Sequence, residues 1–364
     1  MKITINDKNY EAEKGQTILE VAQENGINIP TLCHSPYLSD VGACRMCLVE
    51  DKNDGNLKTS CTTQVQDGME VYTDSERVIE SRETILDLLI SDHPLDCMTC
   101  EADGNCELQD LAYEYGIERS SYGTKDEARF SIESENEFIE VDPDKCILCG
   151  KCVRVDQEVQ CSDAIDFVER GFATKIGAAN DEGLGGEEST CVFCGQCVDM
   201  CPTGALSYIP AKGKGRKYDF EQTVTTCPYC GVGCQLELNT KGREIVQVDS
   251  VARENTPNPA GETCVKGRFG YDFVNHPDRL TKPLIKRNGE FEEAEWDEAL
   301  ELVAENLSSI KDEYGGKYLA GLSSAKCTNE ENYLMQKFMR AVIGTNTVDH
   351  CARLCHASTV AGLV

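Results

Sequence analysis

The alternation of apolar and polar residues at the start of the chain predicts a β-strand over residues 2–6, with the sequence Lys-Ile-Thr-Ile-Asn. Thr17 and Glu20 then have the spacing of a capping box, which predicts the first turn of a short helix that Gly26 can end. Apolar residues at helical spacing predict an amphipathic helix over residues 76–91. The apolar residues of this helix are Val78, Ile79, Ile85, Leu88 and Leu89. The first part of the chain is therefore expected to mix strands and helices.

From Arg279 to the end, the pattern alternates between helix and strand. Residues 318–322 predict a short buried strand, and Thr328 with Glu331 forms a second capping box before a helix that Gly344 can end. One further helix face is predicted by Trp296, Leu300, Val303, Leu307 and Ile310. This order predicts the start of an α/β domain. We expect the sequence to stop inside that domain, as the N-terminal portion of a longer protein.

The composition narrows the class of protein. The 364 residues are enough for two or three domains, and 22 of them are cysteine. Disulfide scaffolds this rich in cysteine are usually short secreted domains, but no secretory or twin-arginine signal is visible. No apolar run approaches the roughly 18 residues of a membrane span, and the net charge of -29 argues against binding to nucleic acid or anionic membranes. We therefore expect reduced, metal-bound thiols in a cytoplasmic protein.

The first group of cysteines has the spacing C-x10-C-x2-C-x13-C, and it consists of Cys33, Cys44, Cys47 and Cys61. Four thiolates can hold a 2Fe-2S cluster, and Gly42 and Ala43 are small enough to let the backbone approach it. A zinc ion is the alternative. The spacing resembles the N-terminal ferredoxin module shared by complex I large subunits, iron-only hydrogenases and some formate dehydrogenases. His34 is not expected to be a ligand, because four thiolates already fill the site.

The second group combines one histidine with three cysteines in the pattern H-x3-C-x2-C-x5-C, and it consists of His93, Cys97, Cys100 and Cys106. The pattern is similar to the 4Fe-4S module of the same three families, in which one histidine and three cysteines hold the cluster. A neutral imidazole in place of a thiolate removes a negative charge and should raise the reduction potential, as at other iron-sulfur centres. Such a centre can store electrons or lie beside the main path.

Residues 146–201 resemble a bacterial ferredoxin domain with two clusters. The second half is regular, C-x2-C-x2-C-x3-C-P, with Cys191, Cys194, Cys197 and Cys201. The first half begins with Cys146, Cys149 and Cys152, but Asp156 occupies the position of its fourth cysteine. In such domains the fourth cysteine of each run ligates the other cluster. For the cluster of the second half, three alternatives follow: Cys161 is the fourth ligand, Asp156 supplies an oxygen ligand, or the cluster has three irons.

A count of ligands favours Cys161. Nineteen of the 22 cysteines precede the C-terminal segment, and with His93 they supply four ligands to each of five clusters only if Cys161 is included. The glycine-rich stretch over residues 177–186 predicts a flexible loop between the two half-motifs. A basic stretch follows, formed by Lys212, Lys214, Arg216 and Lys217. We interpret it as a solvated connector, with a docking site for a partner as the alternative.

The last group, C-x2-C-x3-C-x29-C-x-K-G, is the most discriminating motif, and its cysteines are Cys227, Cys230, Cys234 and Cys264. It resembles the 4Fe-4S domain that opens the molybdopterin oxidoreductases, whose metal is held by two pterin guanine dinucleotides. Zinc is again the alternative. In that family a lysine two residues past the last cysteine lies between the cluster and a pterin, and Lys266 matches it. On this resemblance its charge would stabilise reduced states of both groups. By spacing alone it is a lysine in a turn.

Cys355 and His356 complete the candidates. Residues 349–359 resemble the active-site loop of molybdenum or tungsten formate dehydrogenases, in which the metal takes a cysteine or selenocysteine followed by histidine. On that resemblance Cys355 would ligate the metal, since a thiolate suits a soft metal centre, and His356 would handle the proton. By itself a cysteine pair four residues apart, here Cys351 and Cys355, is more often a buried core pair. Cys327 is expected to pack in the interior, and Cys351 has no assigned role.

Together these motifs predict an α+β, multi-domain chain. The expected domains are a β-grasp 2Fe-2S ferredoxin-like domain at 1–78, a histidine-ligated 4Fe-4S domain at 79–120, a two-cluster 4Fe-4S ferredoxin-like domain at 138–211, the molybdopterin oxidoreductase 4Fe-4S domain at 220–276, and the truncated α/β start of the molybdopterin catalytic domain at 277–364.

The resemblance implies the catalytic (alpha) subunit of a formate dehydrogenase, which interconverts formate and carbon dioxide. The implied cofactors are one 2Fe-2S cluster, four 4Fe-4S clusters, and molybdenum or tungsten held by two molybdopterin guanine dinucleotides, which Lys266 and Cys355 would contact. The present stretch alone is expected to be inactive. A flavin- or NAD-binding partner subunit, or a ferredoxin, is implied as electron acceptor, since no G-x-G-x-x-G motif occurs. The alternatives are a complex I-like electron-transfer protein without a substrate and another molybdopterin oxidoreductase.

Overall fold

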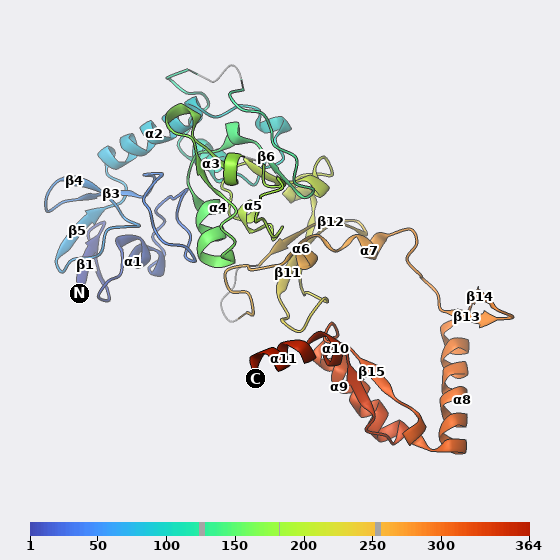
Figure 1. Ribbon diagram of the computed structural model, residues 1–364. Coiled ribbons are helices and arrows are strands. Elements are labelled where there is room, and N and C mark those ends of the chain that lie inside the picture. Colours follow the sequence, from blue (N-terminus) through green and yellow to red (C-terminus); the bar gives the residue numbers. More distant parts are fainter. Residues whose placement is uncertain (124–127, 182, 252–255) are drawn as a thin grey trace.

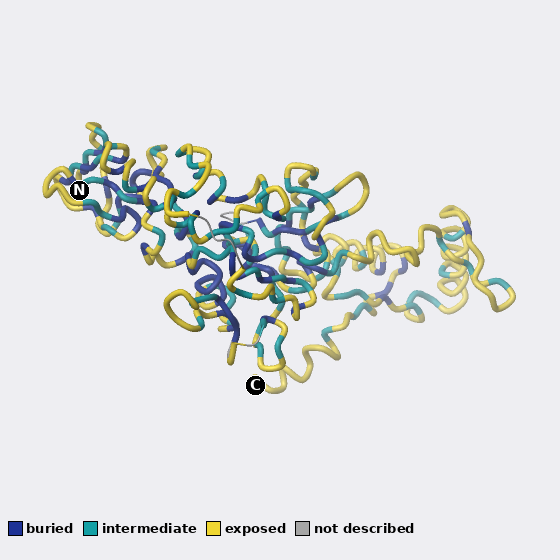
Figure 2. The backbone as a smooth tube through the Cα atoms, turned by 90° about the horizontal axis from the view of Figure 1, so that it is seen from above, coloured by how far each residue is buried: buried dark blue, intermediate teal, exposed yellow. Residues whose placement is uncertain are grey.

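A computed structural model describes residues 1–123, 128–181, 183–251 and 256–364. The chain forms a row of small modules that follow one another in sequence order, with the N-terminus at one end (Figure 1). Beyond α7 (Asp272–Asn275) the chain leaves this row and forms an arm that carries the C-terminus. Buried residues are concentrated in the row, whereas most residues of the arm are exposed (Figure 2).

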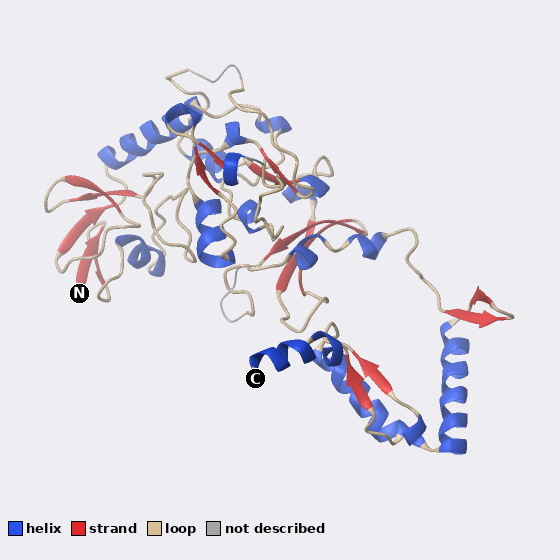
Figure 3. Ribbon diagram, in the orientation of Figure 1, coloured by secondary structure: helices blue, strands red, loops and turns tan. Residues whose placement is uncertain are grey.

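A five-stranded sheet and one helix form the N-terminal module (Figure 3). The strands are β1 (Lys2–Ile5), β2 (Lys8–Glu11), β3 (Leu48–Asp51), β4 (Asn56–Thr59) and β5 (Met69–Tyr72). Their order is β2-β1-β5-β3-β4; β1 runs parallel to β5, and the other pairs are antiparallel. The predicted capping box of Thr17 and Glu20 is present and starts α1 (Ile18–Glu24), whose apolar face packs with Ile3 and Ile5 in one core.

The amphipathic helix α2 (Glu76–Ser91) has the predicted bounds, but its buried face differs from the prediction. The buried stripe is Val78, Arg82, Leu86 and Ile90, each four residues apart, whereas the predicted face residues Ile79 and Leu88 are exposed. Arg82 belongs to this stripe because its Nη2 donates to the carbonyl of Leu48 at 2.7 Å, which ties the helix to β3. Leu86 of this stripe packs with Leu108 and Leu111 of α3 (Glu107–Glu114), whose N-cap is Cys106.

The central module contains two short antiparallel strand pairs and two short helices. The pairs are β6 (Ile139–Val141) with β9 (Leu206–Tyr208), and β7 (Asp166–Val168) with β8 (Lys175–Gly177). Helix α4 (Lys151–Arg154) continues into the π-helical turn η3 (Val155–Gln160), and α5 (Gln196–Asp199) packs against both. The predicted loop over 177–186 includes the 3-10 turn η5 (Ala179–Asp181), and position 182 lies outside the described residues.

A third module shares its core with the central one. Strands β10 (Glu221–Thr226), β11 (Gln235–Lys241) and β12 (Glu244–Ser250) form an antiparallel sheet, followed by α6 (Val265–Phe269). Phe269 of α6 and Val246 of β12 join the core of the central module, where the Phe269 ring meets Tyr208 edge-on at 5.7 Å between centroids. The relative position of these two modules is therefore fixed by apolar packing.

The C-terminal arm contains the predicted alternation of helices and strands. Its elements are β13 (Leu284–Arg287), β14 (Glu290–Glu293), α8 (Trp296–Tyr314), η8 (Gly316–Tyr318), β15 (Gly321–Ser323), α9 (Asn329–Lys337), η9 (Phe338–Ile343), β16 (Val348–His350), α10 (Ala352–Cys355) and α11 (Ala357–Leu363). The capping box at Thr328 is confirmed, and Gly344 ends the following helix in a left-handed conformation.

The helix predicted from Trp296, Leu300 and Val303 is confirmed as α8, and these three apolar residues are exposed. One expectation for the arm is wrong. The strand predicted over 318–322 begins only at Gly321, and Leu322 is 76% exposed because its single strand partner is β16. Within the described ranges, no helix is long and apolar enough to cross a membrane.

Candidate functional site

The first cysteine group lies on the loops that flank β3 and β4. The Sγ atoms of Cys47 and Cys61 are 3.3 Å apart, and the amide of Cys44 donates to the Sγ of Cys33 at 3.5 Å. A hydrogen bond from the Cys44 thiol lowers the pKa of Cys33 to about 6, and one from the Cys61 thiol lowers the pKa of Cys47 to about 6. The same two hydrogen bonds raise the pKa values of Cys44 and Cys61, so one thiol of each pair favours the thiolate, which is the form that binds metal. The structure therefore brings these four side chains together.

The second group gathers its three thiols around η1 (Cys97–Thr99) and the start of α3. Burial raises the pKa of Cys97, and the charge on Cys100 raises it further; burial also raises the pKa of Cys106 to about 11. The backbone of the central module closes over this group at Gly204, where a Cβ would lie only 2.5 Å from the Sγ of Cys100. A residue with any side chain would therefore displace that thiol.

His93 lies in the turn after α2, four residues before Cys97. It lines a cavity of about 330 Å³ together with Cys44, Cys146 and Leu148. His93 is the predicted fourth ligand of the second group. It thus lines the same cavity as a cysteine of the first group and a cysteine of the central module.

The two half-motifs of the central module share one backbone conformation. Leu148 and Gly150 have φ values of 53° and 69°, and the corresponding Phe193 and Gly195 have 56° and 75°. A left-handed conformation is uncommon for leucine and phenylalanine and persists only where the surroundings impose it. Here it turns backbone amides toward the thiols: the N–H of Leu148 donates to the Sγ of Cys146 at 3.4 Å. Each half-motif therefore forms a loop with amides directed at its cysteines.

Amide donors act on the other cysteines of these loops in the same way. Burial raises the pKa values of Cys149, Cys191 and Cys194, and backbone hydrogen bonds from the residue two positions further on oppose that rise. Hydrogen bonding to sulfur stabilises the charged thiolate and is one of the properties that set the potential of an iron-sulfur cluster. These repeated loops fit the chemistry of a cluster.

The structure pairs Cys201 with the first half-motif. Burial raises the pKa of Cys146 to about 11 and that of Cys149 to about 12, and in both cases the charge on Cys201 adds to the rise. Burial also raises the pKa of Cys152, and the charge on Cys201 is among the further causes. Cys201 therefore joins the three cysteines that are far from it in sequence, as the ligand exchange between the two runs requires.

Asp156, and not Cys161, is the buried residue beside the second half-motif. Burial raises the pKa values of Cys191, Cys194 and Cys197, and the charge of Asp156 contributes to all three. Asp156 is 7% exposed, whereas Cys161 lies at the surface with its Sγ 4.0 Å from the carbonyl of Glu158. This arrangement favours the aspartate alternative over the one preferred from the ligand count.

The Asp156 carboxylate is held by three donors. Its Oδ2 accepts from the amides of Ala164 at 2.6 Å and Ile165 at 3.1 Å, and its Oδ1 accepts from the hydroxyl of Ser162. A carboxylate offers about four lone-pair sites on its two oxygens. Oδ1, with one donor, therefore keeps a site with which it could bind iron.

Within the described residues, no set of three or more His, Cys, Asp or Glu side chains is arranged to hold a single metal ion.

The last cysteine group forms the outer edge of the third module. Burial raises the pKa of Cys227, and the charges of Cys264 and Cys230 raise it further. The three thiols therefore lie close enough to interact. The amide of Cys227 donates to the carbonyl of Cys234 at 2.8 Å, which closes the loop that carries three of them. Lys266 is exposed on α6, two residues after Cys264.

Cys355 and His356 lie on the arm, at the end of α10 and just after it, and both side chains are exposed. The thiol with polar partners in this segment is instead Cys351. Its Sγ accepts from the amide of Ala325 at 3.3 Å, and this hydrogen bond lowers the pKa of Cys351. Sequence reasoning assigned no role to Cys351, because the contact exists only where β16 pairs with β15. The predicted packing residue Cys327 is half-buried.

The basic stretch after the central module is ion-paired along its length, with Lys212 and Lys214 exposed to solvent. Lys212 pairs with Glu140 at 2.7 Å, Lys214 with Glu244 at 3.0 Å, Arg216 with Glu101 at 3.4 Å and Lys217 with Asp249 at 3.2 Å. The carboxylates belong to three different modules, which the local sequence could not reveal. The stretch therefore fastens neighbouring modules together.

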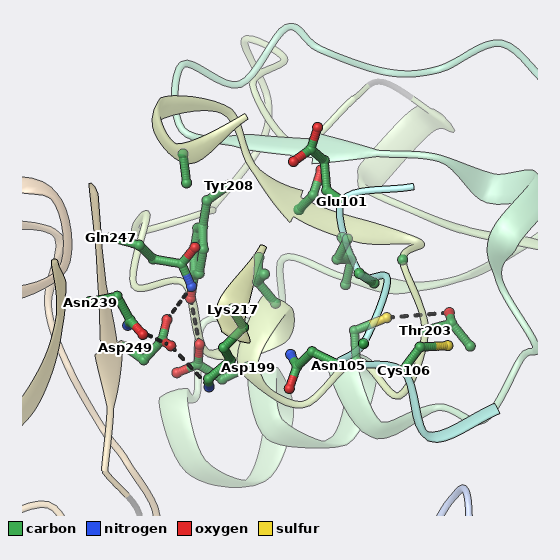
Figure 4. A pocket seen from close by; sticks show the side chains of 18 of the residues that line it. Glu101, Asn105, Cys106, Asp199, Thr203, Tyr208, Lys217, Asn239, Gln247 and Asp249 are labelled. Atoms are coloured by element: carbon green, nitrogen blue, oxygen red, sulfur yellow. Dashed lines mark hydrogen bonds and ion pairs between the residues drawn. The ribbon is translucent and has the colours of Figure 1, made fainter. Parts of the chain in front are cut away.

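A cavity of about 380 Å³ lies where three modules meet (Figure 4). Cys106 lines one part of it and Asp249 of β12 another. Cys201 is also a lining residue. Asp249 accepts from the Nδ2 of Asn239 at 3.0 Å and pairs with the Nζ of Lys217. Substrate pockets are mostly apolar with a few polar groups. These ion-paired walls are more typical of a seam between modules.

Family models match the chain in the order predicted from its motifs. They are the 2Fe-2S iron-sulfur cluster binding domain over 1–76, the NADH-ubiquinone oxidoreductase-G iron-sulfur binding region over 82–121, the NADH-quinone oxidoreductase subunit 3 ferredoxin-like domain over 136–207, the molybdopterin oxidoreductase Fe4S4 domain over 220–276, and molybdopterin oxidoreductase over 279–363. The predicted multi-domain α+β fold class is confirmed.

Curated relatives extend well beyond this chain. "NADPH-Fe(3+) oxidoreductase subunit alpha" of Geobacter sulfurreducens is 41% identical over 359 residues, which cover 99% of this chain and 41% of the relative. A Staphylococcus aureus protein named "Putative formate dehydrogenase" is 34% identical over 400 aligned positions, covering 99% of this chain and 40% of the relative. The chain thus spans about two fifths of the length of these relatives.

A solved structure resembles part of this chain. It is a crystal structure of an NAD+-reducing NiFe hydrogenase in the H2-reduced state, with a TM-score of 0.52 and 30% sequence identity. The similarity covers 59% of this chain and 90% of that chain.

Proposed function

We propose that this chain, which carries iron-sulfur domains followed by the Fe4S4 domain and the beginning of the catalytic domain of a molybdopterin oxidoreductase, is the N-terminal part of a formate dehydrogenase catalytic subunit. The observation that carries the proposal is the Cys355-His356 pair at the end of this order of modules. A thiolate is a suitable ligand for molybdenum or tungsten, and an adjacent imidazole can exchange a proton near neutral pH. The relative from Staphylococcus aureus carries a formate dehydrogenase name, which supports this choice of substrate.

The proposal assigns each cysteine group to one cofactor. The first group would hold a 2Fe-2S cluster, and the second, with His93, a 4Fe-4S cluster. The first half-motif with Cys201 would hold another 4Fe-4S cluster, and the last group a further one. For Cys191, Cys194 and Cys197, we propose Asp156 as the fourth ligand, with Cys161 as the alternative. The burial of Asp156 beside the three thiols supports this choice.

The residues of this chain would have separate tasks in the reaction. The pterin-bound metal supplies the two-electron chemistry at carbon when it is present. Cys355 would hold that metal through its sulfur, and the exposed imidazole of His356 would take up or release the proton. Lys266 would place a positive charge beside the last cysteine group and favour its reduced state. The cluster row would then carry electrons toward a flavin- or NAD-binding partner or a ferredoxin, in the reducing cytoplasm.

A second candidate function follows from the relative from Geobacter sulfurreducens. That protein is named as a subunit of an NADPH-Fe(3+) oxidoreductase and is 41% identical to this chain. The solved hydrogenase chain that resembles part of this chain also comes from an enzyme described as NAD+-reducing. The alternative is therefore an electron-transfer subunit that exchanges electrons with a nicotinamide-using partner and has no formate chemistry.

One experiment separates the two candidates. The full-length protein is produced without oxygen, supplied with molybdate and tungstate, and assayed for formate-dependent reduction of viologen. The Cys355→Ala variant is compared with Cys327→Ala, a matched control in which a half-buried thiol of the same arm is removed. Formate oxidation by the native protein and the control, lost in Cys355→Ala, supports the first proposal. If formate is inert and NADPH reduces ferric iron through a copurified partner, with Cys355→Ala unaffected, the second candidate is correct.

A further inference from the structure

Arg268 is a buried arginine that joins the central and third modules. Its side chain is 1% exposed and uses its donors on both sides of the boundary. The Nε donates to the carbonyl of Cys194 at 3.2 Å, and Nη1 donates to the carbonyl of Val248 at 3.1 Å. Both Nη atoms bind the carboxylate of Asp199, at 3.1 and 2.7 Å. The guanidinium is therefore fixed in one position by the loop of Cys194 and by strand β12.

The same arginine reaches the loop of the last cysteine group. Its Nη2 donates to the Oγ1 of Thr263 at 3.1 Å, and Thr263 immediately precedes Cys264. The Thr263 hydroxyl in turn donates to the carbonyl of Cys194 at 2.9 Å. Arg268 and Thr263 thus connect the backbone at one predicted cluster ligand with the residue beside another.

Arg154 makes the corresponding connection at the other end of the central module. It is 7% exposed, and its Nη2 donates to the carbonyls of Cys33 at 2.6 Å and Cys149 at 3.3 Å. Its remaining described hydrogen bonds also go to carbonyls, those of Ser39 and Gly150. Arg154 therefore links the first cysteine group to the first half-motif.

The two contacts repeat at equivalent positions. Cys149 and Cys194 are the second cysteines of the two half-motifs, and each carbonyl accepts a hydrogen bond from a buried guanidinium. The glycine that follows each cysteine packs beside the arginine: a Cβ at Gly150 would lie 3.9 Å from the Nε of Arg154, and one at Gly195 would lie 3.0 Å from the Nε of Arg268. Two unrelated arginines, one from α4 and one from α6, thus occupy matching sites.

We propose that Arg154 and Arg268 are positioning residues for electron transfer, each fixing the spacing between two neighbouring cluster loops and placing a positive charge beside them. The planar fork of arginine can bind carbonyls of two loops at once, which a lysine cannot reproduce. A fixed cation favours the extra electron on a nearby cluster. The proposal rests on the proposed function only in that the cysteine groups hold clusters.

The surroundings predict different consequences for the two arginines. The charge of Arg268 is paired with Asp199, so its main effect is on spacing. Arg154 donates to carbonyls, and the one carboxylate that its charge is described as affecting is that of the exposed Glu158. Its charge is thus only partly offset, so Arg154 should also raise the reduction potentials of the clusters of the first group and the first half-motif. Arg154 is thus expected to act on potential and spacing, and Arg268 on spacing.

The test uses the full-length protein with its clusters, reduced chemically in a redox titration followed by electron paramagnetic resonance. Arg154→Gln should lower the equilibrium constant for reduction of the 2Fe-2S cluster about tenfold, a shift of about 59 mV for a one-electron couple. Arg154→Lys should leave the reduction potential of the 2Fe-2S cluster nearly unchanged. It should abolish the magnetic interaction between that cluster and the cluster of the first half-motif. Arg268→Lys and the milder Thr263→Val should weaken that interaction for the last cluster with little change in potential. The exposed Arg170→Gln is the matched control.

Potentials and interactions equal to those of Arg170→Gln in all four variants would overturn the proposal. If the arginine variants lose clusters altogether, Thr263→Val decides, because it removes one hydroxyl and leaves both arginines in place. An unchanged interaction in that variant would also overturn the role assigned to the Arg268 bridge. The clusters are reduced chemically here, so the outcome is independent of whether formate is the substrate.

Discussion

The fourth ligand of the cluster of Cys191, Cys194 and Cys197 can be tested by replacing Asp156 with asparagine. Asparagine keeps an oxygen that can accept from the amides of Ala164 and Ile165, but it removes the carboxylate that would bind iron. We expect Asp156→Asn to contain one iron fewer per chain than the native protein and to show the signal of a three-iron cluster after oxidation.

The structure gives the energetic scale of this experiment. Deleting the whole carboxylate, as in Asp156→Ala, leaves the two buried amides at 2.6 and 3.1 Å without an acceptor. Each unsatisfied buried group costs about 1–3 kcal/mol, so Asp156→Ala should destabilise the module by about 2–6 kcal/mol. That is a large part of the roughly 5–15 kcal/mol that keeps a domain folded. Asp156→Asn keeps the acceptor and should cost less than Asp156→Ala, so its loss of iron can be read apart from unfolding.

Iron per chain, electron paramagnetic resonance and denaturant unfolding are measured together. Cys161→Ser tests the alternative from the ligand count, in which Cys161 is the fourth ligand. Asp163→Asn, at an exposed position, is the matched control. Full iron in Asp156→Asn together with a loss in Cys161→Ser would refute the argument from burial. Full iron in both variants, with a three-iron signal already in the native protein, would show that neither residue is a ligand.

Three further predictions concern packing and pH. Gly204→Ala should expel cluster iron from the second group, because its Cβ would lie 2.5 Å from the Sγ of Cys100; iron analysis against Gly213→Ala, at a position with open space, checks this. Leu86→Ala, at a fully buried site, should cost about 2–5 kcal/mol of unfolding free energy in urea, and a loss below 1 kcal/mol would contradict the described core. Burial raises the pKa of Tyr271 to about 12, above the ordinary value of about 10. Between these values the unfolded chain loses the proton first, so stability should fall with rising pH by roughly 2 kcal/mol; Tyr271→Phe should abolish that part of the fall.

Features that depend on a few neighbouring residues were predictable from the sequence. The capping boxes at Thr17 and Thr328 form as expected, because the side chain and the amide it binds lie within one turn. The cysteine groups were recognisable because metal-binding loops keep short, fixed spacings. The bounds of α2 followed from its pattern, but its buried face did not, because the deep position of Arg82 depends on a carbonyl of β3 and on the hydroxyl of Tyr115.

The exposed face of α8 shows the reverse case. The periodicity of Trp296, Leu300 and Val303 correctly predicted a helix, since the pattern of a helix is local. Whether that face is buried depends on a second surface, and Trp296, Leu300 and Val303 are exposed in the structure. An amphipathic pattern therefore predicts a helix with one apolar face. It does not predict which surface covers that face.

The sequence by itself determined the order of the modules, the cysteine groups and the helix starts, because each depends on residues close together in the chain. Only the tertiary structure decided that Asp156 is buried while Cys161 is exposed, and that Arg154 and Arg268 bridge neighbouring loops. These partners lie up to 121 residues apart. Their contacts arise from the packing of one module on another. A hydrogen bond between modules forms only where that packing brings the donor and the acceptor together.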